Sequence, residues 1–141
     1  MMFERTCDLA HLEAFVKEVL HALGEEGILL LRGNLASGKT AFVKAFADAL
    51  NIKEPISSPT FSILHEYDNT LFHYDIYQCG TEGFIKSGLI EKLEIKGYHL
   101  IEWGGSEFET LLQHYGIPYS TIDIDVSGAK RHYKVHINAY A

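Results

Sequence analysis

The feature that most constrains the fold is an apolar segment, a glycine-rich turn and an amphipathic segment in immediate succession. The segment GILLLRG is continuously apolar and bounded by glycine, which is typical of a strand buried on both faces of a sheet. The turn GNLASGKT follows, and after it Phe42, Phe46 and Leu50 recur at helical spacing. We therefore expect a helix from about Lys39 to Leu50. A buried strand that leads through such a turn into a helix is the setting of a phosphate-binding loop.

The turn itself has the spacing G-x-x-x-x-G-K-T, which brings backbone N–H groups together into a nest for an anion. Gly33 and Gly38 give the backbone the freedom that this needs. Lys39 would reach the outer phosphates of a nucleotide, and the Thr40 hydroxyl would bind Mg²⁺. The turn thus predicts a nucleotide site made by Gly33, Leu35, Ala36, Ser37, Gly38, Lys39 and Thr40.

Two carboxylates are candidates for the chemistry on a bound nucleotide. Asp75 and Glu102 each follow apolar residues in an expected strand, LFHYD and YHLIE. There a carboxylate can hold magnesium, directly or through water, or orient the attacking water. We predict that Lys39, Asp75 and Glu102 are catalytic, with Glu102 as a metal ligand and Asp75 as metal support or water orienter. The reverse assignment and a merely solvated strand carboxylate remain open.

The rest of the chain alternates between helical and strand patterns. Asp8 to Gly24 and SEFETLLQHYG, opened by Ser106, predict helices, and GFIKSGLIEKLEIKG predicts a helix broken at Gly88. TFSILHEYD and LFHYDIYQ predict an antiparallel hairpin, with His73, Asp75 and Tyr77 on one face. YHLIEW, STIDIDVS and HYKVHIN predict further strands. We expect an α/β fold: a P-loop NTPase-like three-layer sandwich, with a central mixed β-sheet flanked by helices.

Length and charge limit the function classes. The 141 residues suggest one domain, residues 1–141. The net charge of −7 argues against direct nucleic-acid binding, which draws its affinity from Lys and Arg. The one locally basic stretch, KRHYKVH, is best interpreted as a charged edge strand. Without an export signal, a membrane-length apolar run or metal-spaced cysteines, the sequence predicts a cytoplasmic protein without membrane contact.

Four blocks, GNLASGKT, SSPTFSILHEY, FHYDIYQ and LIEWGG, occur in the order and at the intervals of a known family. Together they resemble the TsaE (YjeE) family of small bacterial P-loop ATPases, which support threonylcarbamoyladenosine modification of tRNA beside the anticodon. The likeness covers nearly the whole chain. It implies an ATPase that uses ATP with Mg²⁺, is weak alone and is stimulated by partners.

The resemblance also implies roles for residues outside the phosphate loop. Ser58 and Thr60 match the family's switch-like loop, and Trp103 matches an aromatic residue that faces a switch or a partner. Arg131 matches an arginine before the final strand, which suggests nucleotide binding. Gln78 replaces the usual arginine of its block, so a contact made by that position is in question.

In the family the ATPase works with two proteins, TsaB and TsaD, and TsaD transfers the threonylcarbamoyl group. The resemblance therefore implies an accessory protein bound to TsaB and TsaD homologues. Two alternatives remain: a nucleotide-dependent binding module without catalysis, and a small P-loop kinase. A kinase would place several arginines around the transferred phosphoryl group, whereas this sequence has only Arg5, Arg32 and Arg131.

Overall fold

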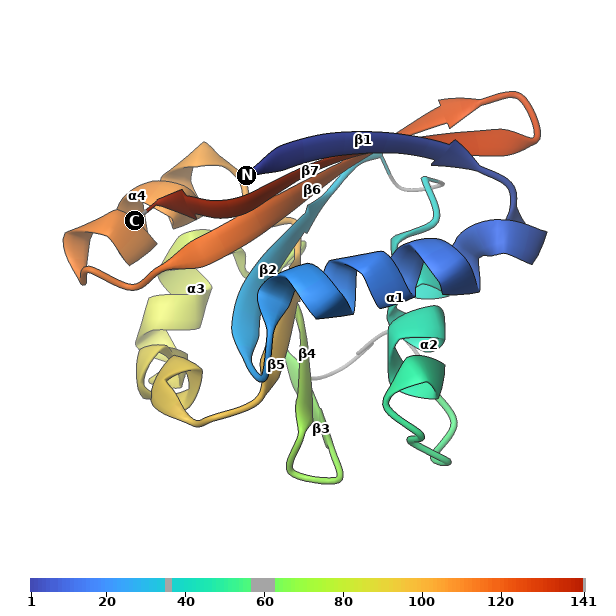
Figure 1. Cartoon of the computed structure of the whole chain (residues 1–141). Coiled ribbons are helices and arrows are strands. Elements are labelled where there is room, and N and C mark those ends of the chain that lie inside the picture. Colours follow the sequence, from blue (N-terminus) through green and yellow to red (C-terminus); the bar gives the residue numbers. More distant parts are fainter. Residues whose placement is uncertain (35–36, 57–62, 141) are drawn as a thin grey trace.

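The core of the molecule is a mixed β-sheet (Figure 1). The computed structural model describes residues 1–34, 37–56 and 63–140. Strands within these ranges form one sheet in the order β1-β7-β6-β2-β5-β4-β3. The β6–β2–β5–β4 part is parallel, and the β1–β7, β6–β7 and β3–β4 pairs are antiparallel. The strands are β1 (Met2–Cys7), β2 (Gly27–Arg32), β3 (Leu64–Tyr67), β4 (Leu71–Asp75), β5 (Tyr98–Glu102), β6 (Tyr119–Ser127) and β7 (Lys130–Tyr140).

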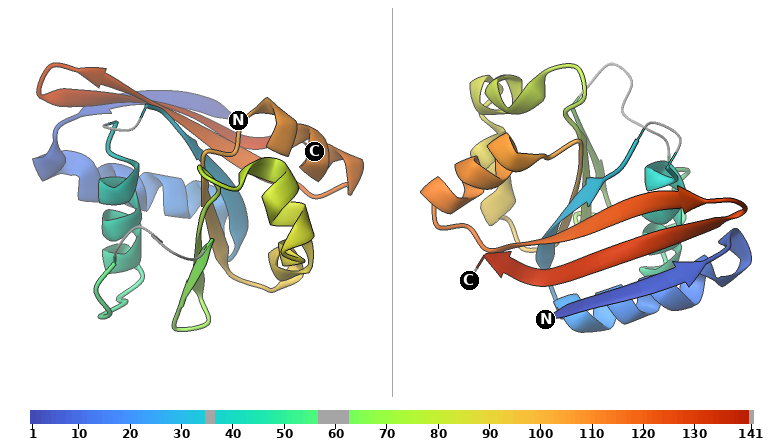
Figure 2. Two further views of the ribbon diagram at one scale, coloured as in Figure 1. Left: turned by 180° about the vertical axis from the view of Figure 1, so that it is seen from behind. Right: turned by 90° about the horizontal axis from the view of Figure 1, so that it is seen from above.

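Helices cover both faces of the sheet, which makes three layers (Figure 2). On one side lie α1 (Leu12–Leu23), preceded by the 3₁₀ turn η1 (Leu9–His11), and α2 (Lys39–Ala49). On the other side lie α3 (Gly80–Lys86), the 3₁₀ segment η2 (Leu89–Glu94) and α4 (Ser106–His114). The expected α/β sandwich is confirmed. Within the described ranges, no helix is both long and apolar enough to cross a bilayer.

Strand β2 joins the two cores because its side chains alternate between them. Leu29 and Leu31 pack under α1 and α2, whereas Ile28 and Leu30 pack under α3 and α4. All four are buried, and full burial of such a side chain contributes about 1.5–3 kcal/mol. This explains why the run from Ile28 to Leu31 is apolar at every position, and it fixes the strand that leads into the glycine-rich turn.

Two of the other predicted features, the hairpin and the helix break, agree with the structure, whereas the predicted position of Tyr77 does not. The hairpin turns through Asp68 and Asn69, both at positive φ, as a tight hairpin turn requires. Gly88, at φ 71°, breaks the α3–η2 segment as predicted. Tyr77 lies beyond the end of β4, so it does not share a strand face with His73 and Asp75.

Two predictions are wrong, one on the position of a strand in the sheet and one on the start of a helix. The basic segment KRHYKVH is not an edge strand, because β7 pairs with β6 on one side and with β1 on the other. The edge is β1, which the sequence analysis missed. Helix α4 is not capped by Ser106: Gly105 precedes it without a side-chain cap, and the Ser106 carbonyl accepts a hydrogen bond from the Thr110 hydroxyl.

Candidate functional site

The candidate site lies where the parallel strands β2, β5 and β4 end. In the sheet register Leu31 is beside Glu102, and Glu102 is beside Asp75. Arg32 ends β2 and leads directly into Gly33. The glycine-rich turn and both predicted carboxylates therefore meet at one edge of the sheet. Crevices at the carboxyl ends of parallel strands are the usual ligand sites of open α/β sheets.

Close packing at Gly33 and a positive φ at Gly38 explain why the turn needs its two framing glycines. A Cβ on Gly33 would lie 2.5 Å from Ser37 Oγ and 2.8 Å from the Ile124 backbone oxygen. Gly38 has φ 100°, a conformation that side chains disfavour, and immediately precedes α2. The Ser37 N–H donates to the Asn34 carbonyl at 2.9 Å. Leu35 and Ala36, also predicted to bind nucleotide, lie outside the described residues.

Lys39 is held at the centre of the site. Its Nζ donates to the carbonyls of Gly33 at 2.7 Å and Asn34 at 2.8 Å, and lies 4.0 Å from the Trp103 ring centroid. Burial lowers the pKa of Lys39, although the negative charges of Glu102 and Asp75 oppose this shift. The ammonium group and the two carboxylates thus share one electrostatic environment, as a site for a metal–phosphate complex requires.

The two carboxylates differ in their surroundings. The Glu102 side chain is 4% exposed and its Oε2 is 2.5 Å from His73 Nε2. Asp75 is half-buried, and its Oδ1 accepts the Tyr77 backbone N–H at 3.0 Å. Thr40 follows Lys39 in the first turn of α2. Among the described residues, no cluster of three His, Cys, Asp or Glu side chains could hold a metal ion. A metal here would need oxygens from the ligand or water as well.

Trp103 has a strained backbone beside Lys39. Its φ is 71°, which is rare for a bulky residue, and such strain is concentrated at functional sites. Its ring lies 4.7 Å from that of Tyr77, which is 54% exposed. A cavity of about 350 Å³ adjoins the two rings and reaches Ser106 and Glu107 at the start of α4. The aromatic pair therefore separates Lys39 from an open part of the surface.

Arg131 reaches the glycine-rich turn from the start of β7. Its Nε donates to the Ser37 carbonyl at 2.9 Å, and the Cβ position of Gly38 lies 3.6 Å from the same Nε. The structure thus brings this predicted residue to the predicted loop. The predicted switch residues Ser58 and Thr60 lie outside the described residues.

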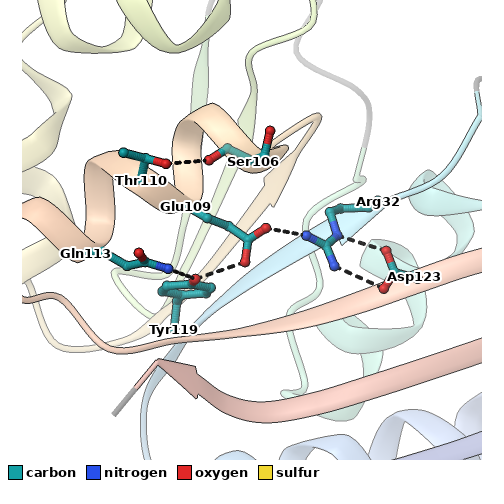
Figure 3. Close-up of polar contacts among 7 residues, drawn as sticks. All are labelled: Arg32, Ser106, Glu109, Thr110, Gln113, Tyr119 and Asp123. Atoms are coloured by element: carbon teal, nitrogen blue, oxygen red, sulfur yellow. Dashed lines mark hydrogen bonds and ion pairs between the residues drawn. The ribbon is translucent and has the colours of Figure 1, made fainter.

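An ionic network that the sequence patterns did not predict lies at the entry to the turn (Figure 3). The Arg32 guanidinium binds both carboxylate oxygens of Asp123 in β6, at 2.8 and 3.0 Å, and Glu109 of α4 at 2.6 Å. Glu109 also accepts the Tyr119 hydroxyl at 2.8 Å, and that hydroxyl accepts from Gln113. The position of Arg32 directly before Gly33 was the only available signal. The network ties the end of β2 to β6 and α4.

The strand order, the helices on both faces and the G-x-x-x-x-G-K-T turn between a central strand and its helix define an α/β protein with a P-loop NTPase-like fold. The comparisons agree. The chain belongs to the TsaE family, because the family model described as "Threonylcarbamoyl adenosine biosynthesis protein TsaE" matches residues 6–135. This family takes part in the biosynthesis of threonylcarbamoyladenosine in tRNA.

Three curated relatives are each described as "tRNA threonylcarbamoyladenosine biosynthesis protein TsaE". The Treponema pallidum protein is 44% identical over 90 residues, which are 61% of this chain and 67% of the relative. The Bacillus subtilis protein is 40% identical over 79 residues, 54% of this chain and 49% of the relative. The Aquifex aeolicus protein is 42% identical over 67 residues, 44% of this chain and 50% of the relative. The alignments thus span about half to two thirds of these relatives.

A solved structure has the same fold. The crystal structure of Bacillus subtilis YdiB superposes with a TM-score of 0.69, covering 99% of this chain and 87% of that chain. The sequence identity is 24%, so this likeness concerns the fold alone.

Proposed function

We propose that this chain binds ATP with Mg²⁺ and hydrolyses it, as an accessory protein required for threonylcarbamoyladenosine modification of tRNA in the cytoplasm. The observation that carries the proposal is the meeting of Lys39, Asp75 and Glu102 at the end of the parallel strands. Family membership adds the pathway. A binding module would need the loop and Lys39, but not two carboxylates on neighbouring strands beside them.

The residues fit a magnesium–nucleotide complex. The absence of a Cβ at Gly33 and Gly38 allows the backbone to close around an anion, and α2 contributes the partial positive charge of its first turn. Lys39 would exchange its two carbonyl partners for phosphate oxygens. Magnesium would be held by Thr40 and Glu102, with Asp75 in support, and when bound it neutralises the charge that develops on phosphate oxygens.

The chain's own groups then divide the work. Lys39 holds the outer phosphates, Glu102 fixes the metal side, and Asp75 orients a water or supports the metal. The Asp75 carboxylate is the more exposed of the two, which suits contact with water. Arg131 of β7 holds the loop in shape through its hydrogen bond to the Ser37 carbonyl. Trp103 and Tyr77 limit the access of water near Lys39.

We further propose that TsaB and TsaD homologues are the partners and that tRNA is not bound directly. The net charge of −7 supports the second point, since polynucleotide binding draws its affinity from Lys and Arg. Of the three arginines, Arg5 binds Glu18, Arg32 binds Asp123 and Glu109, and Arg131 donates to the Ser37 carbonyl of the loop. Because each arginine already has a partner within the chain, we expect none of them to stabilise the charge on the terminal phosphate. Hydrolysis should therefore be slow until partners bind.

The test uses Glu102→Gln and Asp75→Asn, which keep side-chain size and remove charge. We expect ATP·Mg²⁺ affinity to stay within about tenfold, or 1.4 kcal/mol. Multiple-turnover hydrolysis with both partners, and tRNA modification in the reconstituted system, should fall far more. Asp48→Asn, an exposed carboxylate further along α2, is the matched control. Normal hydrolysis by both site variants would instead identify the loop as a binding device.

A further inference from the structure

The polar contact described for the Glu102 carboxylate is with His73. Its Nε2 lies 2.5 Å from Glu102 Oε2, and the two side chains are 0% and 4% exposed. His73 is on β4 and Glu102 is on the adjacent parallel strand β5. His73 is two residues before Asp75, so both side chains point to the same face of β4. The strand pattern predicts His73 on this face but assigns no role to it.

The other ring nitrogen indicates which way the hydrogen bond runs. His73 Nδ1 is buried and has no hydrogen-bond partner within residues 1–34, 37–56 and 63–140. An ionised carboxylate can only accept a hydrogen bond, and a proton on Nδ1 would be a buried donor without an acceptor. The proton therefore belongs on Nε2, which donates to the Glu102 carboxylate, and Nδ1 keeps its lone pair.

The contact removes a freedom that a metal-binding carboxylate must lose. A glutamate has three side-chain torsions, and holding such a side chain in one orientation costs conformational entropy. Backbone pairing fixes only the Cα of Glu102, through Leu31 and Asp75. The bond to His73 engages Oε2, so that Oε1 is the remaining oxygen. The orientation of the carboxylate is thus set by a rigid neighbouring strand.

We propose that His73 is a positioning residue: its Nε2–H donates to Glu102 Oε2 and fixes the orientation of that carboxylate at the ATP·Mg²⁺ site. The inference rests on the proposed function of the site. Residues that hydrogen-bond to a metal-binding side chain and orient it typically contribute 10–100-fold to metal affinity or activity. His73→Phe, which keeps a ring and removes the donor, should lose turnover with partners by about that factor. Its ATP·Mg²⁺ dissociation constant should stay within about tenfold, as expected for Glu102→Gln.

A conservative variant separates the hydrogen bond from mere packing. His73→Gln places an amide N–H near the position of Nε2 and should recover most of the turnover that His73→Phe loses. The matched control is His99→Gln. His99 is a buried histidine on β5, and its ring contacts the Tyr74 hydroxyl and the Ile95 carbonyl rather than a carboxylate. Equal losses in His73→Phe and His73→Gln, with both variants folded, would overturn the proposal.

A spectroscopic measurement on the nucleotide-free protein tests the bond without any activity. Nitrogen-15 NMR of the histidine side chains should show His73 as the Nε2–H tautomer, with a proton protected from exchange that becomes labile in Glu102→Ala. An Nδ1–H tautomer would refute the inference. If wild type with partners hydrolyses no ATP, the proposed function fails, while the tautomer still decides whether His73 holds Glu102. If His73→Phe does not fold, the comparison of wild type with His73→Gln and the NMR result carry the test.

Discussion

Replacing Gly33 by alanine tests how tightly the loop is packed onto the sheet. The new Cβ would lie 2.5 Å from Ser37 Oγ and 2.8 Å from the Ile124 backbone oxygen, both far inside van der Waals contact. Ser37 is 1% exposed and its carbonyl accepts from Arg131, so it has little room to move. Ile124 belongs to β6 and is paired with Tyr133 of β7, which fixes its carbonyl.

The magnitude follows from these two obstacles. Overpacking of this kind costs about 1–3 kcal/mol, and a fixed backbone atom puts Gly33→Ala at the upper end, about 2–3 kcal/mol. The reduced freedom of the unfolded chain returns roughly 0.4–1 kcal/mol, which leaves a net loss of about 2 kcal/mol. For a chain of this size that lowers Tm by roughly 6–8 °C.

Thermal unfolding followed by circular dichroism measures this shift, with Gly105→Ala as the control. Gly105 has an extended backbone at φ −88°, and a Cβ there would meet no atom within 4 Å. The control should keep or slightly raise Tm. If Gly33→Ala unfolds within 1 °C of Gly105→Ala, the close approach of the loop to β6 does not constrain the fold, and the reasoning is wrong.

Three further predictions concern the site and its surroundings. Lys39→Ala and Thr40→Ala should each weaken ATP·Mg²⁺ binding, by roughly 10–100-fold for Lys39 because charge-assisted bonds are lost, and isothermal titration calorimetry checks both. Trp103→Leu should lower tRNA modification in the reconstituted system more than it lowers ATP affinity; an equal loss in both would contradict a switch or partner role. Burial lowers the pKa of His99, with partial opposition from its bond to the Ile95 carbonyl. The unfolded chain therefore binds more protons, and stability falls as pH drops below about 6.5. Urea unfolding at pH 7.5 and 5.5 should show a smaller acid loss in His99→Gln than in wild type.

Local patterns were sufficient for the central part of the fold. The unbroken apolar run of β2, the helical spacing of Phe42 and Phe46, and the Asp68–Asn69 turn each act over a few residues, so they can be recognised in the sequence. The first strand could not be recognised in this way. Its residues MFERTC are mostly exposed. They are ordered by pairing with β7, in which His136 lies beside Met2.

The same distinction applies to the site. The spacing of the phosphate loop predicted Lys39, and strand patterns predicted Asp75 and Glu102. The contacts that hold these groups join residues far apart in the chain, such as Arg131 with Ser37 and His73 with Glu102. Nothing in a local pattern encodes such a distance, so the sequence predicted the functional groups but not the groups that orient them.

The position of β7 between β1 and β6 has a consequence for the order in which the protein is built. Arg131 binds the loop at Ser37, 94 positions earlier in the chain. Met2 can pair with its strand partner His136 only after β7 has been made. During synthesis the loop and its helix leave the ribosome before residues 130–140 do, so β2 and α2 are made while β6 and β7 are still missing. Pairings of such long range are slow to form. The phosphate loop should therefore acquire its final shape among the last events of folding, after β7 has been translated.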